Sequence, residues 1–192
     1  MTAVAPTRER LLRAARDVVE EGGYTAATVL AVAERAGVAA GTLYRHFESK
    51  EKMLVELFRA VCDREVSAME ATAAAMPDGA SDADRIEAVL TTFAERALRR
   101  PRLAWALIAE PVAPAVDAER LAYRARYAEL VAGALRRATD AGELPRQDVA
   151  VTAAALVGGC GEALVGPLAA ERPDPERTVA ALRGFVRRAI GA

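Results

Sequence analysis

Apolar residues recur at helical spacing along almost the whole chain. A first helix is predicted to begin at Thr7, its expected cap, and to end at the glycine pair 22–23. Two short helices are predicted over 28–36 and 39–45, and Gly37 separates them. No segment shows the alternating pattern of a β-strand, so the chain is predicted to be all-α.

The remainder of the chain is predicted to form six further helices, which brings the total to about nine. They cover about 49–75, 83–99, 101–109, 116–141, 148–167 and 175–190. Ser49, Ser81 and Asp174 are the expected caps of three of them. The helix over 116–141 carries two apolar stripes, one from Leu121 and one from Tyr123, which predicts burial on most of its sides.

The composition excludes several classes of protein. With 192 residues, the chain can build a sizeable core and a small appended module. Its best apolar stretch, Val149 to Val157, is interrupted by Thr152 and soon meets Gly158, so we expect no membrane span. No signal peptide is evident at the N-terminus. The two distant cysteines, Cys62 and Cys160, suit a reducing cytoplasm rather than a disulfide scaffold.

Charge and histidine content argue against most enzymes. The chain has 26 basic and 27 acidic residues, a net charge of −1, so it is not strongly basic. A single histidine, His46, leaves no histidine-based triad and no multi-histidine metal site. No acidic pair has the spacing of a catalytic motif. We therefore expect no catalytic residue, no metal and no cofactor.

The most informative segment, 28–54, has the pattern of a helix-turn-helix. The residues predicted to form its small core are Val29, Val32, Ala33, Val38, Leu43 and Phe47. Those predicted to face outward are small or hydrogen-bonding: Ala39, Ala40, Gly41, Thr42, Tyr44 and Arg45. Such side chains at a helix end suit entry into the major groove of DNA. The pattern alone is common, and an ordinary solvated surface is the alternative.

The same segment resembles the TetR/AcrR family of bacterial transcriptional regulators. The family pattern A-x-x-A-G-V-x-x-G-T-x-Y-x-x-F-x-x-K is matched by AERAGVAAGTLYRHFESK, which runs from Ala33 to Lys50. One departure is Ala39, where the family often has serine or threonine. The resemblance implies a three-helix DNA-binding domain over 1–50 and a helical ligand-binding and dimerisation domain over 51–192.

The resemblance also implies roles for single residues. Thr28 and Lys50 would contact phosphates, and Arg45 would read guanine through O6 and N7. Gly41 would let the helix approach DNA closely. The other expected DNA contacts are Ala39, Ala40, Thr42, Tyr44 and His46, of which the last three would hold the backbone or pack on a thymine methyl group.

By the same resemblance, the larger domain would enclose a pocket for an unidentified small-molecule effector. The expected lining is largely apolar and aromatic: Phe58, Cys62, Phe93, Trp105, Ile108, Tyr123 and Tyr127. The same spacing is also that of an ordinary core. Glu110 ends an apolar helix and joins this set. We expect Glu110 to pair with Arg120 or Arg124, either to fix the fold or to present a charge to the ligand.

The last two helices, 148–167 and 175–190, are expected to form a homodimer interface. Glycines and alanines in the first of them permit close helix approach, and two such pairs would build a four-helix bundle. Internal packing is the alternative. Together these features predict a cytoplasmic regulator that a small molecule releases from a palindromic double-stranded DNA operator, most often as a repressor, without a membrane partner. The alternative is a DNA-binding protein with a filled core and no effector.

Overall fold

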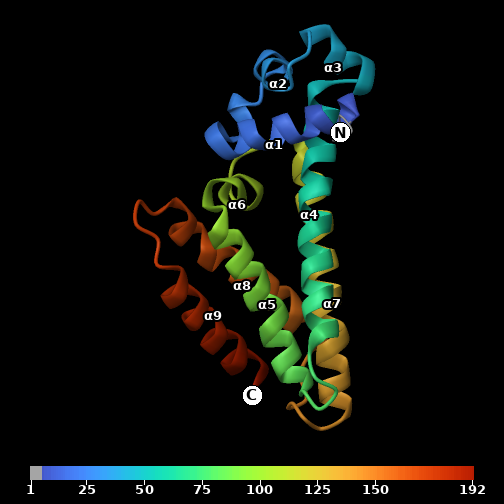
Figure 1. Cartoon of the computed structure of the whole chain (residues 1–192). Helices are drawn as coiled ribbons and strands as arrows, with labels where there is room; N and C mark the ends of the chain where they lie inside the picture. Colours follow the sequence, from blue (N-terminus) through green and yellow to red (C-terminus); the bar gives the residue numbers. More distant parts are fainter. Residues whose placement is uncertain (1–5) are drawn as a thin grey trace. The chain divides into compact units, whose positions relative to one another are not determined.

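The computed structural model describes residues 6–192, and Figure 1 labels the nine helices found there. They are α1 (Thr7–Ala26), α2 (Val29–Arg35), α3 (Ala40–His46), α4 (Lys50–Ala75), α5 (Asp82–Arg99), α6 (Pro101–Ile108), α7 (Pro114–Asp140), α8 (Val149–Ala169) and α9 (Pro175–Ile190). No strand occurs among residues 6–192. The predicted all-α class is confirmed.

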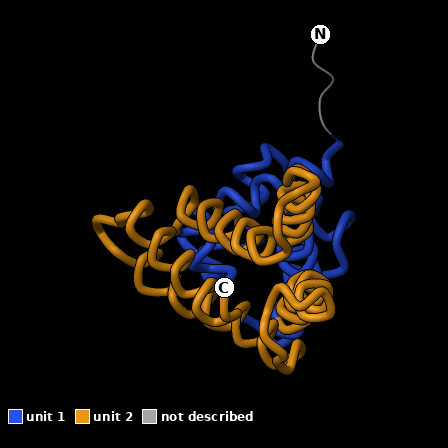
Figure 2. Tube along the Cα trace, turned by 90° about the horizontal axis from the view of Figure 1, so that it is seen from below, with its two compact units in different colours: residues 1–61, 102–120 blue, residues 62–101, 121–192 orange. Residues whose placement is uncertain are grey.

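The chain divides into two compact units, coloured separately in Figure 2. Unit 1 contains the chain up to residue 61 together with 102–120, and unit 2 contains 62–101 and 121–192. The first unit therefore combines the N-terminal helices with a segment that comes much later in the sequence. The functional division at residues 50 and 51 stays a prediction, since these units follow compactness alone.

Local capping chemistry explains where several helices begin. Ser49 accepts the N–H of Lys52 at 3.1 Å, and Ser81 accepts the N–H of Asp84 at 3.0 Å. Asp174 caps α9 in the same way and is followed by a proline in the first turn. The prediction for Thr7 is wrong: Thr7 is the first helical residue, and Pro6 precedes it without a side-chain cap.

The core of unit 1 holds the three N-terminal helices together. Leu11, Ala15 and Val19 of α1 are buried, as are the corresponding residues of α2 and α3: Val32, Ala33 and Leu43. Helix α2 lies beside both α1 and α3. Val29 and Val38, which were expected in this core, are only half-buried, since Val29 is the first residue of α2 and Val38 lies in the turn between α2 and α3.

In unit 2, α5, α8 and α9 pack against one another (Figure 1). Leu156 and Leu164 of α8 and Val186 of α9 are buried at these contacts. Charged groups add to the α5–α9 contact, where the Arg187 side chain pairs with both Asp84 and Glu87.

Two predictions about long helices need correction. Leu121, at the start of one predicted α7 stripe, is 59% exposed, whereas Tyr123 and Tyr127 of the other stripe are buried. Alanines flank both stripes, and such small residues fit either a buried or an exposed face. Helix α8 is long and apolar enough to cross a membrane by length and composition, because Thr152 and Gly158 interrupt its apolar character too little. Most of this helix is not buried within the single chain.

Candidate nucleic-acid interface

The turn between α2 and α3 is held by backbone and side-chain contacts within unit 1. The N–H of Val38 donates to the carbonyl of Ala33 at 3.0 Å, and Gly37 between them has a φ of +66°. Such a positive φ favours glycine, because other residues meet a steric penalty there. The side chain of Arg10 in α1 donates to the carbonyl of Ala36, which fixes the end of α2. The orientation of α3 is therefore set by the preceding helices.

Helix α3, which we call the recognition helix, has one buried anchor and several outward side chains. Leu43 is fully buried, and Phe47, directly after the helix, is also buried. Tyr44 is 57% exposed, and Arg45 and His46 are exposed as well. These outward groups do not contribute to the core, so they are available to a partner outside the chain.

Gly41 of the recognition helix has no structural reason to be glycine. Its φ is not positive, and a Cβ atom placed on it would meet no atom within 4 Å. Glycine weakens a helix relative to alanine, since it loses more backbone entropy on folding. A glycine that is costly for the helix and unnecessary for packing is consistent with close approach of an external partner.

Thr28 caps a helix and keeps a hydroxyl hydrogen that it can donate to a ligand. Its Oγ1 caps α2 by accepting the N–H of Ala31 at 3.1 Å. The hydroxyl hydrogen remains available, because a hydroxyl group is both donor and acceptor. The exposed Thr28 side chain can therefore donate to a phosphate oxygen while it still caps the helix.

The basic side chains near the N-terminus differ in whether they already bind another group of the chain. In the first 52 residues, four arginines are occupied: Arg8 pairs with a glutamate, Arg16 with an aspartate, Arg35 with a glutamate, and Arg10 binds a carbonyl. Within residues 6–192, the remaining four have no ion-pair partner: Arg13, Arg45, Lys50 and Lys52. Three of these four lie between residues 45 and 52. The first 52 residues, which we call the head, thus concentrate their unpaired positive charge at the end of α3 and the start of α4.

All nine sequence-predicted DNA contacts fall on one continuous stretch of unit 1. Thr28, Ala39, Ala40, Gly41, Tyr44, Arg45 and His46 are exposed, while Thr42 and Lys50 are half-buried. Ala39 occupies the N-cap of α3 and provides no side-chain hydrogen bond, as expected of alanine. The placement suits the predicted roles, which stay predictions.

The expected effector-lining residues divide between the two units. Cys62, Phe93, Tyr123 and Tyr127 belong to unit 2. The rings of Phe93 and Tyr127 have centroids 5.7 Å apart, and those of Tyr123 and Tyr127 are 6.3 Å apart. We call these three residues the aromatic cluster. The Tyr123 hydroxyl donates to Asp63 at 2.7 Å.

Burial controls the protonation of this cluster. It raises the pKa of Tyr127, and Cys62 nearby raises it further. Burial also raises the pKa of Tyr123, with a further increase from the hydrogen bond to Asp63. Both phenols are therefore neutral at physiological pH. Burial likewise raises the pKa of the other buried cysteine, Cys160, to about 11, so its thiol is not activated as a thiolate.

The remaining lining candidates, Phe58, Trp105, Ile108 and Glu110, belong to unit 1. Phe58 is buried on α4, whereas Trp105 and Ile108 of α6 are half-buried. The buried Glu110 carboxylate accepts the N–H of Tyr24 through both oxygens, each at 3.0 Å. Glu110 therefore serves the end of α1.

The expected carboxylate–arginine pair of Glu110 takes a different form. Arg120 donates to the backbone carbonyl of Glu110 at 2.8 Å and to that of Leu107 at 2.8 Å. This arginine satisfies the carbonyls at the end of α6, where cations are favourable. Arg124 is exposed. The network contains the predicted Glu110 and Arg120, but the carboxylate binds a backbone N–H group.

Sequence reasoning missed the partners of this network, Gly23, Tyr24 and Arg102. Gly23 has a φ of +76°, and a Cβ atom there would lie 2.6 Å from Oε1 of Glu110. Arg102 donates to the carbonyl of Glu21 at 3.0 Å. The glycine pair at 22–23 was a signal for the end of the helix, but nothing in the sequence indicates that residues 102–110 bind there.

The part of the chain that matches a known protein family contains the candidate interface. Residues 11–57 match the family described as bacterial regulatory proteins, tetR family. The repressor KstR of Rhodococcus jostii is 36% identical over 100 residues, which cover 52% of this chain and 45% of that protein. The regulator UidR of Escherichia coli is 42% identical over 53 residues, 28% of this chain and 27% of that one. The chain thus spans less than half the length of these curated relatives.

Solved structures extend the likeness of fold to nearly the whole chain. The fatty acid degradation regulator FadR of Bacillus halodurans superposes with a TM-score of 0.82 at 20% identity, covering 96% of both chains. FadR of Bacillus subtilis, solved in complex with stearoyl-CoA, gives a TM-score of 0.77 at 21% identity over 95% of this chain and 97% of that one. These identities are low, so the superpositions bear on fold alone. The segment 11–57, which contains the helix-turn-helix, therefore belongs to the TetR family of bacterial regulatory proteins, and for this segment the predicted resemblance is confirmed.

Proposed function

We propose that this chain acts in the cytoplasm as a homodimeric transcriptional repressor that leaves a palindromic DNA operator when a small molecule binds. The observation that carries the proposal is the recognition helix. It anchors itself through buried Leu43 and presents exposed Tyr44, Arg45 and His46 outward. That arrangement suits a helix that enters the major groove of DNA.

Arg45 is the proposed base-reading residue. Its guanidinium has no ion-pair partner among residues 6–192, so binding to DNA does not require an internal pair to break. The planar guanidinium matches O6 and N7 of guanine, whereas Lys50 and Thr28 suit phosphate oxygens. Base recognition is thereby assigned to Arg45, and positioning on the DNA backbone to Lys50 and Thr28.

Two copies are needed because one small head offers few contacts. Helix α8 is strongly apolar yet mostly not buried in the single chain, and its Val151 side chain is 65% exposed. Phe185 of α9 is also exposed. Pairing α8 and α9 with those of a second copy would cover this apolar face. A dimer would set two recognition helices on half-sites about 34–36 Å apart.

For the effector, we propose an acyl-CoA thioester as the first class to test. Support comes from the FadR neighbour solved with stearoyl-CoA and from a 37% identical match, over 65 residues, to the fatty acid metabolism regulator protein of Bacillus subtilis. The aromatic cluster supplies neutral, largely apolar walls in unit 2. A filled core without effector is the alternative, and it predicts that no acyl-CoA changes DNA binding.

The contacts of Arg102 and Glu110 with α1 offer a way in which effector binding could affect the DNA-binding helices. Arg102 of α6 and Glu110 after it bind the last residues of α1, so a displacement of α6 must either move the head or break these contacts. A coupling free energy of about 1–3 kcal/mol between effector and DNA would be ordinary for such a link.

The decisive experiment is a comparison of Arg45→Ala with Arg13→Ala. Both remove an exposed arginine without an ion-pair partner from the same unit, but Arg13 lies on α1. An operator is first selected from random DNA with the parent protein. Arg45→Ala should lose about 1–3 kcal/mol of affinity for the operator and much less for unrelated DNA. Arg13→Ala should leave the specificity ratio unchanged. Equal losses on both DNAs for Arg45→Ala would refute base reading.

The effector class is tested on the same operator complex. Stearoyl-CoA, free CoA and stearate are added separately, and the fraction of bound DNA is measured. The proposal expects release by the thioester at concentrations at which free CoA has no effect. Undisturbed DNA binding with saturating thioester would favour the filled core.

A further inference from the structure

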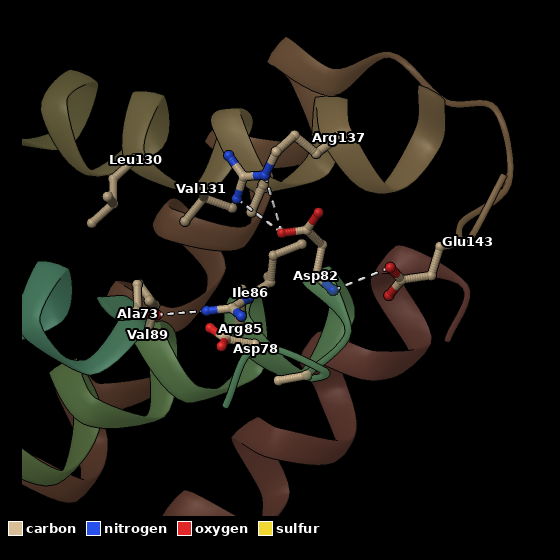
Figure 3. Close-up of a pocket in the computed structure, with 12 residues that line it drawn as sticks. Ala73, Asp78, Asp82, Arg85, Ile86, Val89, Leu130, Val131, Arg137 and Glu143 are labelled. Atoms are coloured by element: carbon tan, nitrogen blue, oxygen red, sulfur yellow. Dashed lines mark hydrogen bonds and ion pairs between the residues drawn. The ribbon is translucent and has the colours of Figure 1, made fainter. Parts of the chain in front are cut away.

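Unit 2 contains a cavity whose lining shares no residue with the aromatic cluster. Its volume is about 500 Å³, and its walls come from the end of α4, the loop after it, α5 and α7 (Figure 3). We call it the α5–α7 pocket. A volume of this size lies in the range of small-molecule sites.

One side of the α5–α7 pocket is aliphatic. Ile86 and Val89 of α5 face Leu130 and Val131 of α7. Three of these four side chains are buried. Because all four are aliphatic, they present only hydrocarbon groups to the cavity. An apolar ligand moiety would remove aliphatic surface from water on both sides, which favours binding.

The rest of the pocket lining is charged. It carries three carboxylates and two guanidinium groups, a net charge of −1: Asp78, Asp82, Glu143, Arg85 and Arg137. An apolar wall with a charged side selects an amphipathic molecule over a purely apolar one. The sign of the charge it selects depends on which of these groups are already neutralised.

Both guanidinium groups are occupied. Arg137 donates to the Asp82 carboxylate at 2.8 Å. Arg85 donates to the carbonyl of Ala73 at 2.8 Å and to that of Pro77 at 2.9 Å, which places its charge on the negative end of α4. Neither arginine is left to bind an added anion without giving up such contacts.

Two of the three carboxylates are occupied as well. Glu143 accepts the N–H groups of Asp82 and Ala83, at 3.1 and 2.9 Å, and so occupies the positive end of α5. Asp82 is neutralised by Arg137. The exposed Asp78 carboxylate is left without a hydrogen-bond or ion-pair partner among residues 6–192. The unmatched charge of the pocket is therefore negative.

We propose that the α5–α7 pocket binds a small amphipathic cation, such as a primary amine with an aliphatic or aromatic body. The apolar body lies between Ile86, Val89 and Val131, and the ammonium group lies at Asp78. The lining of this site shares no residue with the candidate DNA interface or with the expected effector lining.

The first test compares three ligands of equal chain length: octylamine, octanol and octanoate. Binding to the full-length protein is measured by calorimetry well below their micelle concentrations. Because Asp78 is exposed, we expect octylamine to bind about threefold more tightly than octanol, and octanoate to bind more weakly than either. A preference for octanoate, or no saturable binding of octylamine, would overturn the proposal.

The second test locates the site. Ala80 lines the pocket from the loop and is half-buried, so Ala80→Trp should fill the entrance and weaken octylamine binding at least tenfold. The control, Ala71→Trp, adds the same side chain at an exposed α4 position outside the lining and should leave binding intact. If octylamine binds Ala80→Trp as tightly as the parent, the ligand lies elsewhere and the proposal is wrong.

The third test isolates the charge. Asp78→Asn should abolish the preference for octylamine over octanol while octanol affinity stays within about twofold of the parent. Glu171→Gln removes an exposed carboxylate from the loop after α8 and should keep the preference. A preference that survives Asp78→Asn would remove Asp78 from the site and overturn the proposed recognition of the ammonium group.

Discussion

The contact between Gly23 and Glu110 allows a quantitative prediction about the link between the head and the segment after α6. Glu110→Ala removes a side-chain acceptor of the Tyr24 N–H group, which both carboxylate oxygens approach at 3.0 Å. An unsatisfied buried donor costs about 1–3 kcal/mol. Glu110→Gln keeps one acceptor oxygen and should lose less. Urea unfolding followed by circular dichroism measures each loss.

Gly23→Ala perturbs the same contact from the other side. With φ at +76° and ψ at −177°, the backbone conformation alone costs alanine about 1–3 kcal/mol. The new Cβ atom would also lie 2.6 Å from Glu110 Oε1 and 2.7 Å from Oε2, so the carboxylate must leave. Gly23→Ala should therefore be at least as destabilising as Glu110→Ala.

The double variant separates the two contributions. In Gly23→Ala with Glu110→Ala the clash is gone, while the backbone strain and the missing acceptor remain. Its destabilisation should fall below the sum of the single losses by at least about 0.5 kcal/mol. Glu171→Ala, in an exposed loop, serves as the control and should stay within about 0.5 kcal/mol of the parent. Additive losses, or a Glu110→Ala variant as stable as the parent, would refute the reasoning.

Three further predictions concern other parts of the chain. Gly41→Ala should raise the melting temperature by about 1–2 °C, since its Cβ meets nothing, yet weaken operator binding about tenfold or more; unchanged DNA affinity would remove Gly41 from the interface. Val151→Glu should leave the helical content intact and convert a dimer to monomers in analytical ultracentrifugation, because that side chain is exposed in the single chain; a persistent dimer would place the interface elsewhere. Hydrogen bonds from Ser81 and Arg187 lower the pKa of Asp84 below 3.8, so its stabilising contribution is full above that pH and lost as pH falls through the lowered value; Asp84→Asn should flatten the acid limb of the stability profile.

Local chemistry made much of the fold predictable. The caps Ser49, Ser81 and Asp174 lie within three residues of the N–H groups they bind, so sequence alone reveals them. The recognition helix was predictable for the same reason, because its buried Leu43 and exposed Arg45 lie two residues apart on one short helix.

Contacts between distant segments were not predictable in this way. Glu110 and Tyr24 lie 86 residues apart, and no periodic pattern links them. The stripe at Leu121 failed because spacing reports which residues share a face, but not whether this chain covers that face. The same limit applies to the effector lining, where an aromatic at helical spacing is equally suited to a core and to a pocket.

The discontinuous make-up of unit 1 has a consequence for how the protein is made. The head emerges from the ribosome early, but Arg102 and Glu110, which bind the end of α1, are synthesised only after residues 62–101 of the other unit. At about 5–20 residues per second, the nascent helix-turn-helix waits roughly 3–12 s for the segment up to residue 120. Until then the Tyr24 N–H group cannot donate to the Glu110 carboxylate. A chain stalled or truncated near residue 61 would therefore present a DNA-binding head without these contacts, and the full set of head contacts becomes available only once residues 102–120 have been translated.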